Sequence, residues 1–223
     1  MSFTLYNAPQ STCSQRVRFV LNTKGLGFRE VLLNLLAGDQ LKPDYLKLNP
    51  NGVVPTLDHD GQIVIDSNVI TEYLDEVEPE ASFTPEDPVA RARMRTLMHF
   101  IDEMPAAAVR VPTFNLAFLP SFQKMSAKEF DAMAESKPIR REFMKTMGQG
   151  GFPQAEMDSA LARLRRTYER MDDLGLAGWQ DLPRVVTWYK NIRAHPSFAP
   201  TFYPGSLLSE RFPHLREQQA KSA

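Results

Sequence analysis

Residues 11–18 bring together groups that can stabilise a thiolate. Ser11, Cys13 and Ser14 supply hydroxyl and thiol donors where an apolar segment gives way to helical spacing. A thiolate, not a thiol, is the nucleophile in sulfur chemistry, and a helix N-terminus favours negative charge. The run therefore predicts a corner that holds a thiolate, either that of Cys13 or the sulfur of a bound thiol cofactor. The alternative is a polar helix cap followed by a small buried cysteine.

Two later corners have the chemistry to bind a peptide-like ligand. A cis peptide between Val54 and Pro55 would leave the Val54 N–H and C=O free to pair with an extended peptide, although a trans proline at a strand start is the alternative. At Asp66 and Ser67, a helix N-terminus suits a carboxylate and the aspartate suits an ammonium. The pair would hold an α-amino acid head group, or it could be a plain helix cap.

The elements that position these residues follow from periodicity and turn signals. Alternating or continuous apolar runs predict strands over 3–6, 28–35, 53–59 and 62–65. Helical spacing predicts one helix from an N-cap at Ser11 or Thr12 to Lys24, and another from an N-cap at Ser67 to Val77. Asp60-Gly61 marks the hairpin turn between the last two strands. The first two strands should be parallel through a right-handed crossover. This order is thioredoxin-like, with a mixed four-stranded sheet.

The second half of the chain has only helical patterns. Residues 79–88 are acidic and proline-rich, which is typical of a linker, and Pro88 can open a helix capped by Asp87. Pro105 should kink or end that helix. Further helices are predicted from Ser126, from Pro153 and finally around residues 185–195. The helix from Pro153 has an apolar seam of Met157, Leu161, Leu164, Tyr168 and Met171. We therefore predict an α/β domain over 1–78, a linker over 79–88 and an all-α domain over 89–223.

Composition excludes several classes of function. The net charge of -1 gives no reason to expect a nucleic-acid partner or an anionic membrane surface. One cysteine and four scattered histidines predict neither an internal disulfide nor a metal site. The sequence begins without a signal-peptide pattern, and no window approaches the roughly 20 apolar residues of a membrane span. We expect a cytoplasmic protein.

Motifs in the first 78 residues resemble, in order and spacing, the N-terminal domain of cytosolic glutathione transferases. They are Leu5-Tyr6, the Ser11–Arg18 run, Asn49-Pro50-Asn51-Gly52, Val54-Pro55-Thr56-Leu57, Asp60-Gly61 and Asp66–Leu74. The serine-cysteine run is most similar to the zeta class and to bacterial reductive dehalogenases of chlorinated hydroquinones. Residues 124–130, 137–145 and 151–154 resemble bacterial glutathione-dependent β-aryl etherases instead.

The resemblance implies glutathione as the cosubstrate. Val54, beside a cis Pro55, would pair its backbone with the cysteinyl part, and Asp66 and Ser67 would hold the γ-glutamyl ammonium and carboxylate. The glycyl carboxylate would meet Gln40 or Lys42, in the loop before the third strand.

The resemblance offers three candidates for activating the sulfur. Ser11 occupies the position of the zeta-class serine, Cys13 that of the dehalogenase nucleophile, and Ser14 that of the serine in one branch of the β-etherases. No family assignment makes all three catalytic at once, so the choice stays open.

The implied activity is attack of a glutathione thiolate on an electrophilic carbon of a small aromatic substrate, with β-aryl ether cleavage as the specific reaction. Dehalogenation, isomerisation or a non-catalytic binding module are the alternatives, and a homodimer is the family expectation. Phe114, Phe118 and Phe122 are candidate walls for the aromatic substrate, or core residues.

One stretch departs from the family pattern. Residues 168–179 run straight through where the family has a further helix that opens with a capping box. Loss of a central helix would leave a cavity and unsatisfied helix ends. We therefore hypothesise that residues are missing from the sequence between about 170 and 180.

Overall fold

The chain divides into two compact units in a computed structural model that describes residues 2–173 and 183–215. The first unit comprises the chain up to Glu86, Glu135–Arg141 and the chain from Pro196 onward. The second comprises Asp87–Ala134 and Glu142–His195. These bounds differ from the predicted domains because the segment after His195 packs with the N-terminal part of the chain.

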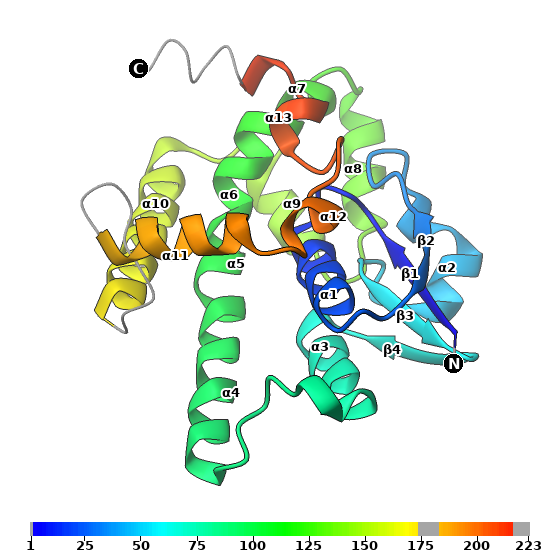
Figure 1. Cartoon of the computed structure of the whole chain (residues 1–223). Helices are drawn as coiled ribbons and strands as arrows, with labels where there is room; N and C mark the ends of the chain where they lie inside the picture. Colours follow the sequence, from blue (N-terminus) through cyan, green and yellow to red (C-terminus); the bar gives the residue numbers. More distant parts are fainter. Residues whose placement is uncertain (1, 174–182, 216–223) are drawn as a thin grey trace. The chain divides into compact units, whose positions relative to one another are not determined.

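The first unit contains a mixed four-stranded sheet, as predicted (Figure 1). Its strands are β1 (Phe3–Asn7), β2 (Phe28–Leu32), β3 (Thr56–His59) and β4 (Gln62–Ile65), in the order β2-β1-β3-β4. β1 pairs parallel with β2 and antiparallel with β3, and β3 pairs antiparallel with β4. The predicted strands over 28–35 and 53–59 were too long. β2 loses its partner where β1 ends, and Pro55 has no N–H to donate to the ladder.

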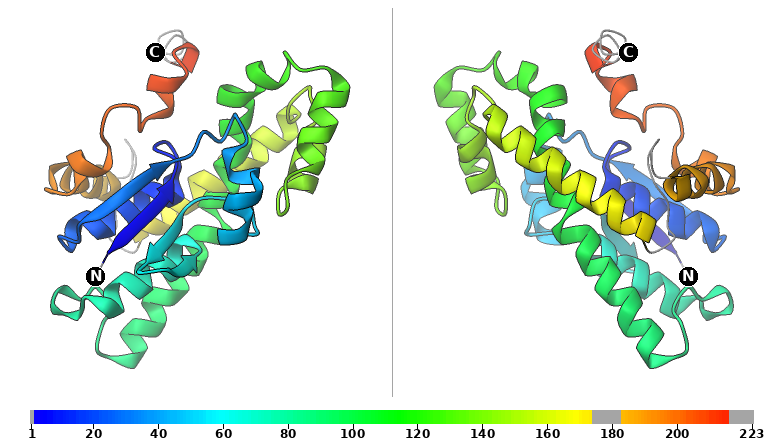
Figure 2. Two further views of the ribbon diagram at one scale, coloured as in Figure 1. Left: turned by 90° about the vertical axis from the view of Figure 1, so that its right-hand side faces the viewer. Right: turned by 90° about the vertical axis from the view of Figure 1, so that its left-hand side faces the viewer.

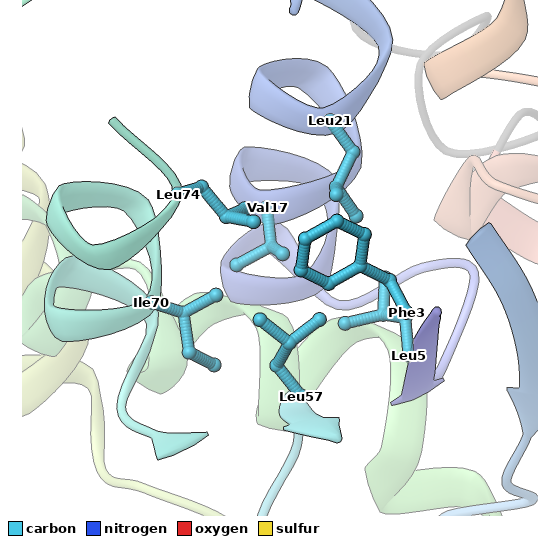
Figure 3. Close-up of a cluster of buried hydrophobic side chains, with 7 residues drawn as sticks. All are labelled: Phe3, Leu5, Val17, Leu21, Leu57, Ile70 and Leu74. Carbon is cyan, nitrogen blue, oxygen red and sulfur yellow. The ribbon is translucent and has the colours of Figure 1, made fainter. Parts of the chain in front are cut away.

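Two helices cover one face of this sheet. They are α1 (Thr12–Thr23) and α3 (Ser67–Val77). Strand side chains alternate between faces, so every second residue of β1 points at these helices. Figure 3 shows the resulting cluster of buried side chains: Phe3, Leu5 and Leu57 from the strands, Val17 and Leu21 from α1, and Ile70 and Leu74 from α3. This cluster fixes both helix N-termini relative to the sheet.

The opposite face carries α2 (Pro43–Leu48), which follows a short 3₁₀ turn at Asp39–Leu41. Tyr45 of α2 is buried together with Ala8 and Val54, and Tyr6 packs against this group. A second 3₁₀ turn, Pro79–Ala81, follows α3.

Two short helices complete the first unit. α12 (Phe198–Thr201) and α13 (Leu208–Arg211) follow residue 195, near which the last predicted helix was expected to stop. That prediction was incomplete because short helices carry little periodicity. The views in Figures 1 and 2 place α12 beside α1, and hydrogen bonds join the two.

The described part of the second unit consists of helices joined by turns and loops, without a strand, as predicted. The helices are α4 (Pro88–Glu103), α5 (Pro105–Ala108), α6 (Arg110–Thr113), a π-helical turn (Phe114–Phe118), α7 (Leu119–Phe122), α8 (Ala127–Glu135), α9 (Arg141–Met147), α10 (Gln154–Asp173) and α11 (Pro183–Ala194). Asp87 caps α4 by accepting the Ala90 N–H at 2.7 Å, and α4 ends before Pro105, both as predicted. The stretch predicted to lack residues falls largely on 174–182, outside the described residues.

Aromatic and methionine side chains form the core of the second unit. Phe114 meets Phe118 and Phe143 edge-on, at centroid distances of 4.9 Å in both cases. The core interpretation is confirmed for Phe122, which is 6% exposed, whereas Phe114 and Phe118 are half-buried in the same cluster.

The predicted seam of α10 was wrong at its centre. Leu161 is 50% exposed, and the buried positions are Ala160 and Thr167 instead. The stripe that faces the unit is therefore rotated from the one that the largest apolar residues predicted. A Thr167 hydroxyl can be buried in a helix because it donates to the Arg163 carbonyl one turn earlier, at 3.0 Å.

Candidate functional site

Ser11 occupies the corner between β1 and α1, and it caps the helix as predicted. Its Oγ accepts the Ser14 N–H at 3.4 Å, and its own N–H donates to the Ala8 carbonyl at 3.0 Å. The residue is half-buried. A serine hydroxyl has one O–H to donate besides its lone pairs, so this corner retains a donor at the positive end of α1.

The other two sulfur candidates differ in access. Cys13 lies in the first turn of α1 as a half-buried free thiol. Ser14 is 0% exposed, and its Oγ accepts the Ala8 N–H at 3.4 Å. A ligand can approach Ser11 and Cys13, but Ser14 is enclosed by the protein and supports the loop before α1.

The segment before β3 contains the predicted cis peptide, between Val54 and Pro55. α2 holds this segment: the Tyr45 hydroxyl donates to the Val53 carbonyl at 2.6 Å, and the Asn49 side-chain amide donates to the same carbonyl at 3.0 Å. Burial raises the pKa of the Tyr45 phenol, which keeps it a donor. Within the described residues, no hydrogen bond engages the Val54 N–H or C=O. That backbone can pair with an added strand.

The corner before α3 differs from the prediction by one residue. Asp66, not Ser67, is the N-cap: its carboxylate accepts the N–H groups of Asn68 at 2.9 Å and Val69 at 3.2 Å. Ser67 is the first residue of α3 and is buried. Its N–H has no hydrogen-bond acceptor among the described residues, so one donor at this helix N-terminus remains for a carboxylate.

Arg16 also belongs to this corner, and the sequence patterns did not single it out. Its guanidinium donates to the Ser67 hydroxyl at 3.4 Å and to the Asn68 side-chain carbonyl. The charge therefore lies on α1 but faces the N-terminus of α3. Position 16 could have been found only by combining the two predicted helices with their order on the sheet.

The two candidates for the glycyl carboxylate lie in different environments. Gln40 is buried, its amide donates to the Leu35 carbonyl at 3.4 Å, and its Oε1 has no partner among the described residues. The Lys42 side chain is 67% exposed and forms an ion pair with Asp39 at 2.7 Å. Of the two, Lys42 is the one that can reach a ligand at the surface.

Shared contacts link these corners within the first unit. Ala8, next to the Ser11 turn, is buried against Val54, and Arg16 joins α1 to the start of α3. α2 connects the 53–56 segment to the loop that carries Lys42. These contacts bring Ser11, Val54 and the start of α3 into one region of the first unit. The side chains of Gln40 and Ser14 are buried.

A buried ion pair supports the far ends of α1 and α3. Lys24 donates to the Asp75 carboxylate at 2.8 Å, and both side chains are almost completely buried. Burial alone would raise the pKa of Asp75. The hydrogen bonds from Lys24, Thr84, Phe83 and Ser82 outweigh it and hold the pKa well below its ordinary value. The pair fixes the segment after α3 to both helices.

The side chains and helices of the described residues also bear on metal binding and membrane insertion. No group of three or more His, Cys, Asp or Glu side chains there could hold a metal ion. None of the helices described is long and apolar enough to cross a membrane.

The sequence matches known proteins along most of its length. Residues 10–77 match the family model described as the glutathione S-transferase N-terminal domain. A protein named LigF from Sphingobium sp. is 33% identical over 190 residues, which cover 80% of this chain and 74% of that protein. The crystal structure of β-etherase LigF from Sphingobium sp. strain SYK-6 superimposes with a TM-score of 0.82 at 26% identity, covering 91% of this chain and 99% of that chain.

A second group of relatives matches a shorter part. A maleylacetoacetate isomerase of Aspergillus fumigatus is 37% identical over 119 residues, which cover 48% of this chain and 52% of that protein. The chain thus spans about half the length of this isomerase. The family model and the longer match to LigF assign the chain to a family by sequence, and the superposition on LigF agrees in fold. The protein belongs to the glutathione S-transferase family of enzymes.

Proposed function

We propose that this enzyme uses glutathione to cleave β-aryl ethers. The observation that carries the proposal is the extent of the match to LigF, which covers 80% of this chain and so reaches well beyond residues 10–77. The isomerase match covers 48%. In this family the second half contributes the pocket for the second substrate, so likeness there bears on substrate choice.

Glutathione would lie along three corners of the first unit. The Val54 backbone pairs with the cysteinyl residue as an added strand. The γ-glutamyl group meets the α3 corner, where the Ser67 N–H takes the carboxylate and Asp66 takes the ammonium. Arg16 adds a positive charge beside that carboxylate. Lys42 meets the glycyl carboxylate after exchanging its ion pair with Asp39.

Ser11 would stabilise the glutathione thiolate. It is the accessible hydroxyl at the α1 N-terminus, and its O–H can donate to sulfur while its lone pair keeps the Ser14 N–H. Ser14 would support the turn from inside, and Cys13 would lie beside the sulfur without forming a bond to it. The helix end and the hydroxyl together lower the pKa of the bound thiol.

The reaction needs no redox step. The thiolate attacks the carbon that bears the aryloxy group, next to a carbonyl that activates it. A C–S bond forms, the C–O bond breaks, and phenolate leaves with the electron pair and is protonated by solvent. The protein contributes a stabilised thiolate and the alignment of sulfur with the carbon.

The second candidate is glutathione-dependent isomerisation or dehalogenation. The isomerase match and the accessible Cys13 favour it. A cysteine at this position could resolve a glutathionyl adduct by disulfide exchange.

We further propose a cytoplasmic homodimer. Light scattering on the purified full chain tests the oligomeric state, and a monomer at micromolar concentration would contradict it.

The experiment is turnover of a β-aryl ether ketone with glutathione, following both phenol and the glutathione adduct. Stoichiometric phenol and adduct support the etherase. We expect Ser11→Ala to lower kcat by about 100-fold, as loss of one donor to a developing or stabilised anion does. Cys13→Ala should change kcat less than about threefold, since it removes no hydrogen bond to sulfur in this mechanism.

Other outcomes would redirect the assignment. Loss of activity in Cys13→Ala, with a glutathione adduct trapped on that residue in the intact protein, would favour the dehalogenase. Turnover of a cis-alkene diacid without ether cleavage would favour the isomerase. Glutathione binding with no turnover of any of these substrates would leave the site in place and reject the ether substrate.

A further inference from the structure

Arg18 is a buried cation whose partners lie far apart in the sequence. Its side chain is 1% exposed. Burial lowers the pKa of its guanidinium, yet arginine stays protonated in proteins, so the charge needs compensation. Nη1 donates to the Asn7 side-chain carbonyl at 2.6 Å, and Nη2 donates to the Pro9 carbonyl at 2.8 Å. Glu30 lies 3.9 Å from Nη1.

The same guanidinium holds the segment after residue 195. Nε and Nη2 donate to the Thr201 carbonyl at 3.2 Å and 3.1 Å, and the Tyr203 ring lies 5.0 Å from the guanidinium carbon. The Tyr203 hydroxyl donates to Glu30 at 3.2 Å. Arg18 thus joins α12 to the loop that leads into the Ser11 turn.

Gln15 repeats this arrangement one turn earlier on α1. Its amide donates to the Pro9 carbonyl at 3.2 Å and to the Ser206 carbonyl at 2.9 Å. Residues three apart on a helix share a face, so both side chains face the same strip of chain. The Pro9 carbonyl therefore receives two donors, each of which also holds the C-terminal segment.

The loop before Ser11 is also held at Ala8, which is buried against Val54 and whose carbonyl accepts the Ser11 N–H at 3.0 Å, but the Pro9 carbonyl is held by Arg18 and Gln15. Pro9 lies two residues before Ser11, and the Ala8 N–H meets Ser14 only through a contact of 3.4 Å. At the other end of α1, Asn22 donates to the Thr201 hydroxyl at 3.0 Å and Thr23 donates to the Ser197 hydroxyl at 3.0 Å. Those contacts hold α12 but do not reach the loop.

We propose that the segment Ser197–Ser206 acts through Arg18 and Gln15 as a clamp on residues 7–10, and that these two are positioning residues for the Ser11 hydroxyl. The clamp rests on the proposed role of Ser11 as thiolate partner. With the clamp in place, Ser11 lies where its O–H meets the sulfur. Without it, glutathione still binds its other corners, but the thiol loses its acidity. The structure thereby gives a function to a segment outside the glutathione-binding motifs.

The test uses the full chain and reads the ionisation of bound glutathione from thiolate absorbance as pH is varied, alongside kcat and KM for glutathione. Gln15→Met keeps side-chain size, and we expect it to raise the pKa of the bound thiol by about 0.5 to 1 unit. It should lower kcat about tenfold, as a small misplacement of a reacting group does. KM for glutathione should change less than about twofold.

Arg18 variants extend the test. Arg18→Lys keeps the charge but loses the planar fork, so it should raise the thiol pKa and still fold. Arg18→Met leaves several buried acceptors without a donor. Its thiol pKa is informative only if circular dichroism shows the native fold. The matched control is Asn22→Ala, which removes a contact to α12 of the same kind at the far end of α1. It should lower stability without moving the thiol pKa.

Two results would overturn the inference. One is an unchanged thiol pKa in folded Gln15→Met and Arg18→Lys. The other is a shift of the thiol pKa in Asn22→Ala as large as in Gln15→Met, because the thiol pKa would then report only a loss of protein stability. A wild-type chain that binds no glutathione, or binds it without forming a thiolate, would instead reject the proposed function itself.

Discussion

The two units build their interiors from different side chains. The sheet cluster of the first unit consists of aliphatic residues and one phenylalanine, drawn from β1, β3, α1 and α3, and most are fully buried. The cluster of the second unit consists mainly of phenylalanine and methionine. Most of the aromatic contacts described there involve a half-buried ring, either Phe114 or Phe143. α4 contributes no buried residue at all.

This difference separates what must stay fixed from what can vary. Branched aliphatic side chains have few rotamers and pack at one geometry, which suits the corners that would hold an invariant cosubstrate. Methionine and edge-on aromatic rings adapt more readily to neighbours. A family that keeps one cosubstrate and changes its electrophile would gain from this division.

The strongest test of the comparison is truncation of one side chain in each cluster. Leu57→Ala should lower the free energy of unfolding by about 4 kcal/mol, because the leucine is fully enclosed and the cavity cannot collapse. Phe118→Ala should cost about 2 kcal/mol, because its half-buried ring removes less area from water. Urea unfolding followed by circular dichroism measures both, with an unchanged m-value as the control. Equal losses would contradict the distinction.

A pair of glycines sharpens the comparison at two matched backbone positions. Gly151 in the second unit has φ +88° and Gly61 in the β3–β4 turn has φ +87°. A Cβ on Gly151 would lie 2.7 Å from Leu119 Cδ2 and 2.9 Å from Asn115 Oδ1, whereas one on Gly61 would meet nothing within 4 Å. Gly61→Ala should cost about 1 kcal/mol from backbone strain. Gly151→Ala should cost about 3 kcal/mol, because crowding adds to the strain.

The glycine pair also tests the π-helical turn. The Asn115 amide donates to the Phe152 carbonyl at 2.8 Å, and its carbonyl accepts the Phe152 N–H at 2.8 Å. Displacing Asn115 should loosen Phe114 and Phe118. Near-ultraviolet circular dichroism should therefore change in Gly151→Ala and not in Gly61→Ala. Similar losses of stability in the two variants would mean that the side chains around Gly151 rearrange to accommodate the added methyl group.

The smallest effect is a pH dependence confined to the first unit. The folded pKa of Asp75 lies below the unfolded value of about 3.9, so its ion pair contributes stability above roughly pH 4. That contribution, on the order of 2 kcal/mol, is lost as the pH falls through the lower folded value. The midpoint of urea unfolding between pH 6 and pH 3 measures the onset of this loss, about 1 kcal/mol at pH 3.

The control for this pH dependence comes from the second unit. Hydrogen bonds from Ser126 also hold the pKa of Glu129 below its usual value, but that carboxylate is exposed. Glu129→Gln should retain the acid loss of the intact protein. If it removed as much of the loss as Asp75→Asn does, buried and exposed carboxylates would not differ in the way proposed here.

Local signals were sufficient for the sheet and for the backbone geometry of most of the candidate site. Turn residues, helix caps and alternation predicted the four strands, the Ser11 cap and the Val54–Pro55 segment, because each is determined by residues close in sequence. The position of a helix cap could be predicted only to within one residue. Asp66 caps α3 where Ser67 was predicted to, because both side chains can cap a helix.

Long-range contacts were beyond the sequence patterns. Nothing local distinguishes Arg18 from a solvated helix residue, because its burial depends on Thr201, 183 residues later. The same holds for Arg16, which meets Ser67, and for Gln40, whose inward orientation depends on how its loop packs. The buried stripe of α10 differs from the predicted one because Ala160 and Thr167 are buried, whereas Leu161 is exposed.

The span between Arg18 and Thr201 has a consequence for synthesis on the ribosome. α1 and its strands are translated long before Thr201 and Ser206 exist, and until then the Arg18 guanidinium lacks two of its hydrogen bonds. A nascent chain that ends near residue 86 would keep the Arg18 contacts to Asn7 and Pro9 but would lack those to Thr201. The first unit therefore gains its last contacts only after all of the second unit has been translated, although its sheet precedes that unit in the sequence.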